Sequence, residues 1–198
     1  MSVTSRRNRL ARLAPQKRNG GTLLEANERL QVLQQVIAAI HSTLDLEEVF
    51  KRITDGAVSS LGYGIAFVAV LNSEKQCFEI KAISAKNQVL PQIGEALGFS
   101  LRSLSIPADA ELNATMRALG EGRVVVSKTV SEIAYPVLSK EACSALQKLG
   151  AGQNYVAVPL QTRGGVVCGI FVSSPREEVP QEELTMLQSF AWAASQAI

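Results

Sequence analysis

The side chains best suited to nucleophilic or metal chemistry in this sequence are three cysteines and one histidine. Cys77, Cys143 and Cys168 are widely spaced and odd in number, which argues against a disulfide framework and for a reducing cytoplasm. His41 stands alone near a predicted helix end, so neither a zinc site nor a Ser/His/Asp triad is expected. The chain also holds no CxxC, P-loop or GxGxxG motif. The sequence therefore predicts no catalytic residues, no metal site and a domain that is not an enzyme.

Charge is distributed unevenly along the chain. Of 20 basic and 18 acidic residues, six basic residues and no acidic one fall within the first 19 positions, so the rest holds 14 basic and 18 acidic residues. This composition predicts a disordered basic arm over residues 1–21. A solvated arm is favoured over one that binds nucleic acid or anionic lipid, so nucleic acid is not an expected partner. No apolar run reaches the ~18–20 residues of a membrane span.

A seven-residue repeat of apolar side chains follows the arm. Its spacings alternate between three and four, which is typical of a coiled-coil-like helix over residues 22–44. We interpret it as a signalling helix that forms a homodimer through Leu30, Leu33, Ile37, Ile40 and Leu44. The alternative is a helix that packs this stripe against its own domain.

A second helix is predicted to begin after Asp45, an N-cap residue followed by two glutamates in the first helical turn. The run from Ile65 to Leu71 is almost continuously apolar, which is typical of a strand covered on both faces. A polar turn then leads to a return strand over residues 77–83.

The segment from 85 to 152 is the least regular part of the sequence. We predict a helix over 88–97, a strand over 99–106, a helix over 108–119, a strand over 123–127 and a helix over 139–149 with Ser139 as its N-cap. Short helices and loops over a sheet are the usual walls of a small-molecule pocket.

Two apolar strands, over residues 155–160 and 166–172, flank a Gly-Gly turn and predict a tight hairpin. Pro159 lacks an N–H group, so we expect it at a sheet edge or a bulge. A helix follows from about residue 180, and we assign Leu187 and Ala191 on it to the dimer interface. Because its apolar pattern is still running at Ile198, we expect a downstream effector domain in the same polypeptide.

This order of elements resembles a GAF domain. The run L-D-L-E-E-V-F at 44–50 is similar to the entry of GAF domains, and V-P-L at 158–160 with G-I-F-V at 169–172 is similar to their last hairpin. The resemblance implies an α+β, GAF/PAS-like fold: a central antiparallel sheet with the N- and C-terminal helices packed on one face. It makes residues 45–198 a sensory domain of a signal-transduction protein, such as a histidine kinase of a two-component system.

Part of the middle segment also resembles the bilin-binding GAF domains of cyanobacterial photoreceptors. Gly122-Arg123-Val124, Cys143-Ser144 and the strand ending at Pro159 occur in the order of the corresponding motifs. Cys143 lies close to the position of the thioether-forming cysteine, but Ser144 replaces the histidine that hydrogen-bonds the chromophore there. A small core residue is the favoured interpretation of Cys143, and bilin remains an alternative cofactor.

The resemblance implies a small-molecule ligand under the middle segment, without naming it. Arg102 would pair with an anionic group and the aromatic side chains would stack on the ligand, with the predicted lining being Arg102, Ser127, Tyr135, Cys143 and Tyr155. Three hypotheses follow: a ligand sensor, a photoreceptor attached through Cys143, and a structural dimerisation module without a ligand. Free-methionine-sulfoxide reductases share the GAF fold but rely on clustered cysteines, which the spacing here does not favour.

Overall fold

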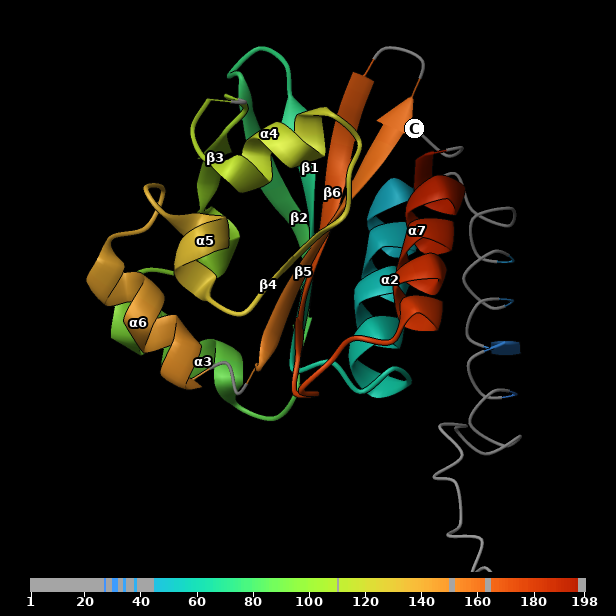
Figure 1. Ribbon diagram of the computed structural model, residues 1–198, viewed down its shortest axis with the longest axis horizontal. Helices are drawn as coiled ribbons and strands as arrows, with labels where there is room; N and C mark the ends of the chain where they lie inside the picture. Colours follow the sequence, from blue (N-terminus) through green and yellow to red (C-terminus); the bar gives the residue numbers. More distant parts are fainter. Residues whose placement is uncertain are drawn as a thin grey trace, which may run out of the picture.

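The computed structural model describes residues 27, 30, 31, 34, 38, 45–109, 111–149, 152–162 and 165–195. The predicted basic arm and most of the predicted coiled-coil-like helix lie outside this set. Within it, an antiparallel sheet stands between two layers of helices (Figure 1). The predicted α+β fold with a central antiparallel sheet is confirmed.

The sheet brings the first and last hairpins of the domain together in its centre. Its order is β3-β2-β1-β6-β5-β4, and every neighbouring pair is antiparallel. The nearly continuous apolar run near residue 65 is therefore central, as predicted, because β1 pairs with both β2 and β6. The strands are β1 (Ile65–Asn72), β2 (Cys77–Ala85), β3 (Ser105–Pro107), β4 (Val125–Ser127), β5 (Asn154–Thr162) and β6 (Gly165–Ser174).

Pro159 lies where a missing N–H group is tolerated. In β5 it faces Gly169 of β6, while the pairing of β5 with β4 covers only Tyr155 to Ala157. The register also shifts between Leu160 and Gln161, one residue beyond the proline. The expected position at an edge or bulge is confirmed.

Two helices, α2 (Leu46–Ser59) and α7 (Gln181–Ser195), lie side by side on one face of the sheet (Figure 1). Asp45 caps α2, since its Oδ1 accepts a hydrogen bond from the Glu47 N–H at 3.0 Å. Leu187 and Phe190 of α7 are fully buried against this face. The predicted packing of the domain's first and last helices on one face is confirmed.

The opposite face is covered by the middle segment. The covering elements are α3 (Val89–Leu97), the 3₁₀ turn η1 (Leu101–Ser103), α4 (Ala114–Gly120), α5 (Val130–Ala134) and α6 (Lys140–Leu149). Ser139 caps α6 as predicted, with its Oγ accepting from the Ala142 N–H at 3.2 Å. The short helix predicted over 88–97 is also confirmed, as α3.

The middle segment departs from the prediction in two places, both caused by side chains that bond to the backbone. The strand predicted over 99–106 is wrong for its first half, because Ser100 accepts from the Arg102 N–H and caps η1 instead. The helix predicted over 108–119 begins only at Ala114. Asp109 holds a turn through the Glu111 N–H at 2.8 Å, and Asn113 provides the N-cap through the Met116 N–H at 2.8 Å. Helix α5, five residues long, was not predicted.

Candidate functional site

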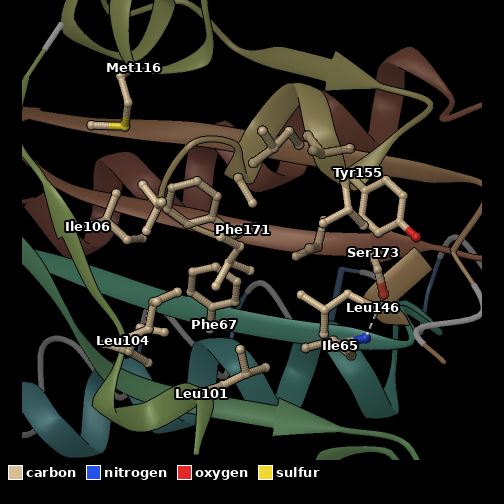
Figure 2. Close-up of a pocket in the computed structure, with 18 residues that line it drawn as sticks. Ile65, Phe67, Leu101, Leu104, Ile106, Met116, Leu146, Tyr155, Phe171 and Ser173 are labelled. Carbon is tan, nitrogen blue, oxygen red and sulfur yellow. Dashed lines mark hydrogen bonds between the residues drawn. The ribbon is translucent and has the colours of Figure 1, made fainter. Parts of the chain in front are cut away.

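A cavity of about 120 Å³ lies between the sheet and the middle segment (Figure 2). Side chains from β1, β2, β3, β5 and β6 form its floor, and η1, α4, α5 and α6 with their connecting loops form its cover. None of the lining residues is charged. They are Ile65, Phe67, Ile80, Leu101, Leu104, Ile106, Met116, Val130, Ile133, Ala134, Val137, Leu138, Leu146, Tyr155, Val156, Phe171, Val172 and Ser173.

A pair of stacked aromatic rings forms the centre of the floor. Phe67 and Phe171 face each other across β1 and β6, and their rings are stacked with centroids 4.7 Å apart at 12° (Figure 2). Gly169 leaves room for this pair, because a Cβ atom there would lie 2.9 Å from Cε2 of Phe171. The absence of a side chain at residue 169 therefore permits the observed position of the Phe171 ring.

Hydrogen bonds from β4 and α6 fix the position of α5 in the cover. The Ser127 hydroxyl donates to the Glu132 carboxylate, and Thr129 Oγ1 accepts from the Glu132 N–H at 3.3 Å. From α6, the Gln147 side chain accepts from the Val130 N–H at 2.8 Å and donates to the Lys128 carbonyl at 3.1 Å. The cover is thus braced by polar contacts behind its apolar inner surface.

Helix α4 is joined to α5 in the same way. Asn113 Nδ2 donates to the Tyr135 carbonyl at 2.8 Å, and the Thr115 hydroxyl donates to the Glu132 carbonyl at 3.0 Å. Because α4, α5 and α6 are connected by these bonds, we expect them to respond together to a change in the cavity.

Polar groups that line the cavity are confined to Tyr155 and Ser173. The Tyr155 hydroxyl donates to the Gly152 carbonyl at 3.2 Å, and Ser173 Oγ accepts from the Ile65 N–H at 2.9 Å. In Figure 2 both residues lie toward the same side of the view as Ile65, while Met116 and Ile106 lie toward the other. The cavity is therefore apolar, with its two hydroxyl-bearing side chains, Tyr155 and Ser173, on one side.

The five residues predicted to bind a ligand are not all at this cavity. Tyr155 lines it, whereas the buried Ser127 braces α5 from outside the lining. Tyr135 is exposed at the end of α5. Arg102, on η1, is exposed beside a separate hollow of about 390 Å³ that borders α3 and also contains Phe99. Cys143 is buried against Val130 and Leu138, behind the lining.

The cysteines are buried free thiols. Burial raises the pKa of Cys143, despite a hydrogen bond from Ser131, and it raises the pKa of Cys168 to about 12. A raised pKa keeps a thiol in its neutral, weakly nucleophilic form. Cys77 begins β2, Cys143 lies on α6 and Cys168 lies on β6, so the three thiols come from three different elements.

The residues assigned to a dimer interface have different surroundings. Leu187 and Ala191 are buried in the chain's own core, under α7. Leu30 is 56% exposed, while Leu33, Ile37, Ile40 and Leu44 lie outside the described residues. On the outer side of α7, Trp192 is 68% exposed.

The aromatic floor was not singled out from the sequence, although a signal for it exists. In β1, Phe67 alternates with the buried Ala66 and Val68 that contact the helix layer. Phe171 alternates in the same way with Ile170 in β6. Because side chains of a strand point to opposite faces in turn, this alternation identifies the residues that face the middle segment.

A family comparison agrees with the fold. The family model described as "GAF domain" matches residues 43–198, which is more than half of the chain. The chain therefore belongs to the GAF domain family, confirming the resemblance seen in its entry and last hairpin. No match to a curated protein was found.

Solved structures place the chain among several kinds of GAF-fold protein. A methyl-accepting chemotaxis protein fragment is 19% identical, with 82% of this chain and 94% of that chain covered and a TM-score of 0.59. The phycoerythrobilin-bound GAF domain of a cyanobacterial phytochrome is 19% identical, with 85% and 93% covered and a TM-score of 0.63. Free methionine-R-sulfoxide reductase from Neisseria meningitidis is 16% identical, with 90% and 92% covered and a TM-score of 0.63. At these identities the likeness shows a shared fold.

Two further features are absent from the residues that the structure describes. None of the helices there has the length and apolar character needed to cross a membrane. The same residues contain no group of three or more His, Cys, Asp or Glu side chains that could hold a metal ion.

Proposed function

We propose that the chain is a sensory GAF domain in which a small molecule bound in the cavity changes the packing of α2 and α7 on the opposite face of the sheet. The observation that carries this proposal is the apolar cavity of about 120 Å³, which the protein's own side chains leave unfilled. A purely structural module would fill this space, because protein interiors are normally close-packed.

The central strands provide a physical route from the cavity to the helices. In β6, Phe171 and Ser173 line the cavity, while the alternating Ile170 belongs to the core under α7. A ligand that displaces the floor also displaces that core, since interiors transmit strain. The ligand shifts the balance between two packing arrangements of α2 and α7 only to the extent that its affinity for the two arrangements differs.

The wider arrangement of the protein is part of the same proposal. Residues 1–21 form a basic arm, and residues 22–44 form the helix that carries the signal within a cytoplasmic homodimer. An effector such as a histidine kinase follows in the same polypeptide. The domain itself is a regulator and not an enzyme, in keeping with buried thiols whose pKa values are raised at Cys143 and Cys168.

A covalently attached bilin receives less support from the geometry than a small free ligand. Cys143 is 1% exposed, is not among the residues that line the cavity, and packs against Val130 and Leu138, which do line it. Pockets that enclose drug-sized molecules measure about 300–1,000 Å³, well above this cavity. Co-expression with bilin synthesis is therefore expected to give a colourless protein.

The test is a thermal unfolding screen with compounds of several chemical classes. Ala134→Phe places a ring in the cavity and is expected to abolish any ligand-induced rise in Tm. Ala114→Phe, at an exposed position of α4, is the matched control and should respond like the wild type. A rise that survives in Ala134→Phe would contradict the proposal. So would the absence of any rise across all classes together with no molecule released by solvent extraction of the purified chain.

A further inference from the structure

We infer that the ligand of this cavity is a compact, uncharged and largely apolar molecule, about the size of one aromatic ring, with a single hydrogen-bond acceptor placed at Ser173. This inference rests on the proposed function, since it specifies what the same cavity binds. It follows from the volume of the cavity, from the absence of charged residues in its lining, and from the hydrogen bonds that its polar side chains already make.

The volume of the cavity limits the size of the ligand. The cavity measures about 120 Å³, and an engineered cavity of about 150 Å³ in another protein, lined by similar side chains, holds benzene. Tetrapyrroles and nucleotides are several times larger than one ring. A ligand of that size would have to displace α5 and its braces to Ser127 and Gln147.

The lack of charge in the lining limits the ligand to a neutral molecule. None of the lining residues is ionisable in the physiological range, and the floor is made of Phe67, Phe171 and aliphatic side chains. An ionised carboxylate or phosphate placed there would lose its hydration without gaining a counter-charge, which is strongly unfavourable. The cavity therefore selects a neutral molecule. The guanidinium of Arg102 does not alter this, because it lies beside a different hollow.

The hydrogen bonds that the lining residues already make limit the number of polar groups that a ligand can place in the cavity. In the described part of the chain, no buried side-chain N or O atom lacks a hydrogen-bond partner, so no group requires a polar ligand to satisfy it. The Tyr155 hydroxyl proton is given to the Gly152 carbonyl. Ser173 Oγ accepts from the Ile65 N–H, and its own proton remains available for one acceptor on a ligand.

The experiment compares probes that differ in one property at a time. Toluene is neutral without an acceptor, benzaldehyde is neutral with one acceptor, and benzoate is charged at neutral pH. Cyclic GMP and biliverdin represent larger ligands. We expect toluene and benzaldehyde to raise the Tm of the wild type and of Ala114→Phe but not of Ala134→Phe, and the other three to have no effect. Val137→Phe, which fills the cavity from the loop after α5, replaces Ala134→Phe if that variant does not fold.

Calorimetric titration tests the role of Ser173. Ser173→Ala is expected to weaken benzaldehyde binding about two- to tenfold, the range for one net hydrogen bond. Toluene binding should change less than twofold, and Ser173→Thr should restore the preference for benzaldehyde. Equal losses for both probes would overturn the assignment of the acceptor to Ser173.

The sensory proposal and the inferred ligand class are contradicted by different results. If cyclic GMP or biliverdin binds in a way that Ala134→Phe blocks, while the neutral probes do not, the ligand class inferred here is overturned and the sensory proposal stands. If the neutral probes bind equally well to Ala134→Phe, they bind elsewhere, and the inference is again overturned. If no compound binds the wild type and solvent extraction of the purified chain releases no molecule, both fall.

Discussion

Arg176 and Glu183 form an ion pair across the loop that connects the central sheet to α7, with Nη1 of the arginine 3.1 Å from Oε2 of the glutamate. The Glu183 side chain is 1% exposed and that of Arg176 is 34% exposed. Tyr63 donates to the same carboxylate oxygen at 3.1 Å, and Arg176 Nη2 donates to the Leu61 carbonyl at 2.9 Å. The start of α7 is thereby tied to the segment between α2 and β1.

Removal of the arginine is expected to destabilise the domain, because it leaves a buried carboxylate without its cation. Arg176→Met should lower the free energy of unfolding by about 2–4 kcal/mol, somewhat below the usual figure for a fully buried pair. The control is Arg117→Met, which breaks an exposed pair with Glu111 and should change stability by no more than ~1 kcal/mol. Urea unfolding at neutral pH measures both. Similar losses for the two variants would show that the buried pair has no special role.

Gly169 is expected to be intolerant of even a methyl group. Gly169→Ala pushes against the Phe171 ring, which is held by its stack on Phe67, and should destabilise the protein by about 1–3 kcal/mol through overpacking. The displaced ring would also enter the cavity and weaken binding of any ligand there. Urea unfolding and ligand titration measure the two effects. Gly98→Ala is a useful comparison, since its Cβ would meet no atom within 4 Å but its φ of +74° still carries a conformational cost. Unchanged ligand affinity in Gly169→Ala would count against the placement of the cavity.

Cys168 is expected to make the protein less stable at alkaline pH. Burial raises its pKa from 9.0 to about 12 in the folded state, so the folded chain keeps a proton that the unfolded chain releases. Its contribution to stability is complete below pH 9, the unfolded value, and is lost as pH rises toward the folded value of about 12. Urea unfolding of the wild type and Cys168→Ala between about pH 8 and pH 11 should give a steeper decline for the wild type. Parallel declines would show that this thiol does not titrate differently on unfolding.

The dimer proposed for residues 22–44 has a separate test. A double substitution of Leu33 and Ile37 to Lys places charges within the seven-residue repeat and is expected to yield a monomer by light scattering after size-exclusion chromatography. Lys at both Gln31 and Gln34, outside the repeat, should leave the dimer intact. If the variant with Lys at positions 33 and 37 remains a dimer, with the same dissociation constant as the wild type, the interface lies elsewhere. The exposed Trp192 on α7 would then be the next position to change.

Much of the fold follows from local patterns in the sequence. Asp45 and Ser139 are N-caps whose side chains bond as their residue types predict, and the hairpin of β5 and β6 follows from two apolar runs around a Gly-Gly turn. These elements depend on contacts between residues close in sequence, so their signals are strong. Near Ser100 the alternating pattern predicts a strand, but the serine side chain caps the 3₁₀ turn η1 there and the strand does not form.

The candidate site was harder to predict because it depends on long-range packing. Phe67 and Phe171 meet only after β1 and β6 pair, across about half of the chain. The chemistry of Ser127 and Cys143 predicts ligand contacts, yet the Ser127 hydroxyl braces α5 and the Cys143 thiol lies behind the lining. The sequence predicts mainly polar residue types as ligand contacts, whereas the cavity that forms is lined almost entirely by hydrocarbon. Once β1 and β6 are known to be neighbours, the alternation of side chains along each strand predicts that Phe67 and Phe171 face the middle segment.

The central claim is that occupancy of the cavity alters the helices on the other face of the sheet. The most direct measurement is hydrogen–deuterium exchange of the backbone amides of α7 (Gln181–Ser195), with and without benzaldehyde, in the wild type and in Ala134→Phe. We predict that exchange in α7 changes on addition of the probe in the wild type and stays constant in Ala134→Phe. Protection confined to the residues around the cavity, with α7 unchanged while the probe is bound, would contradict the account.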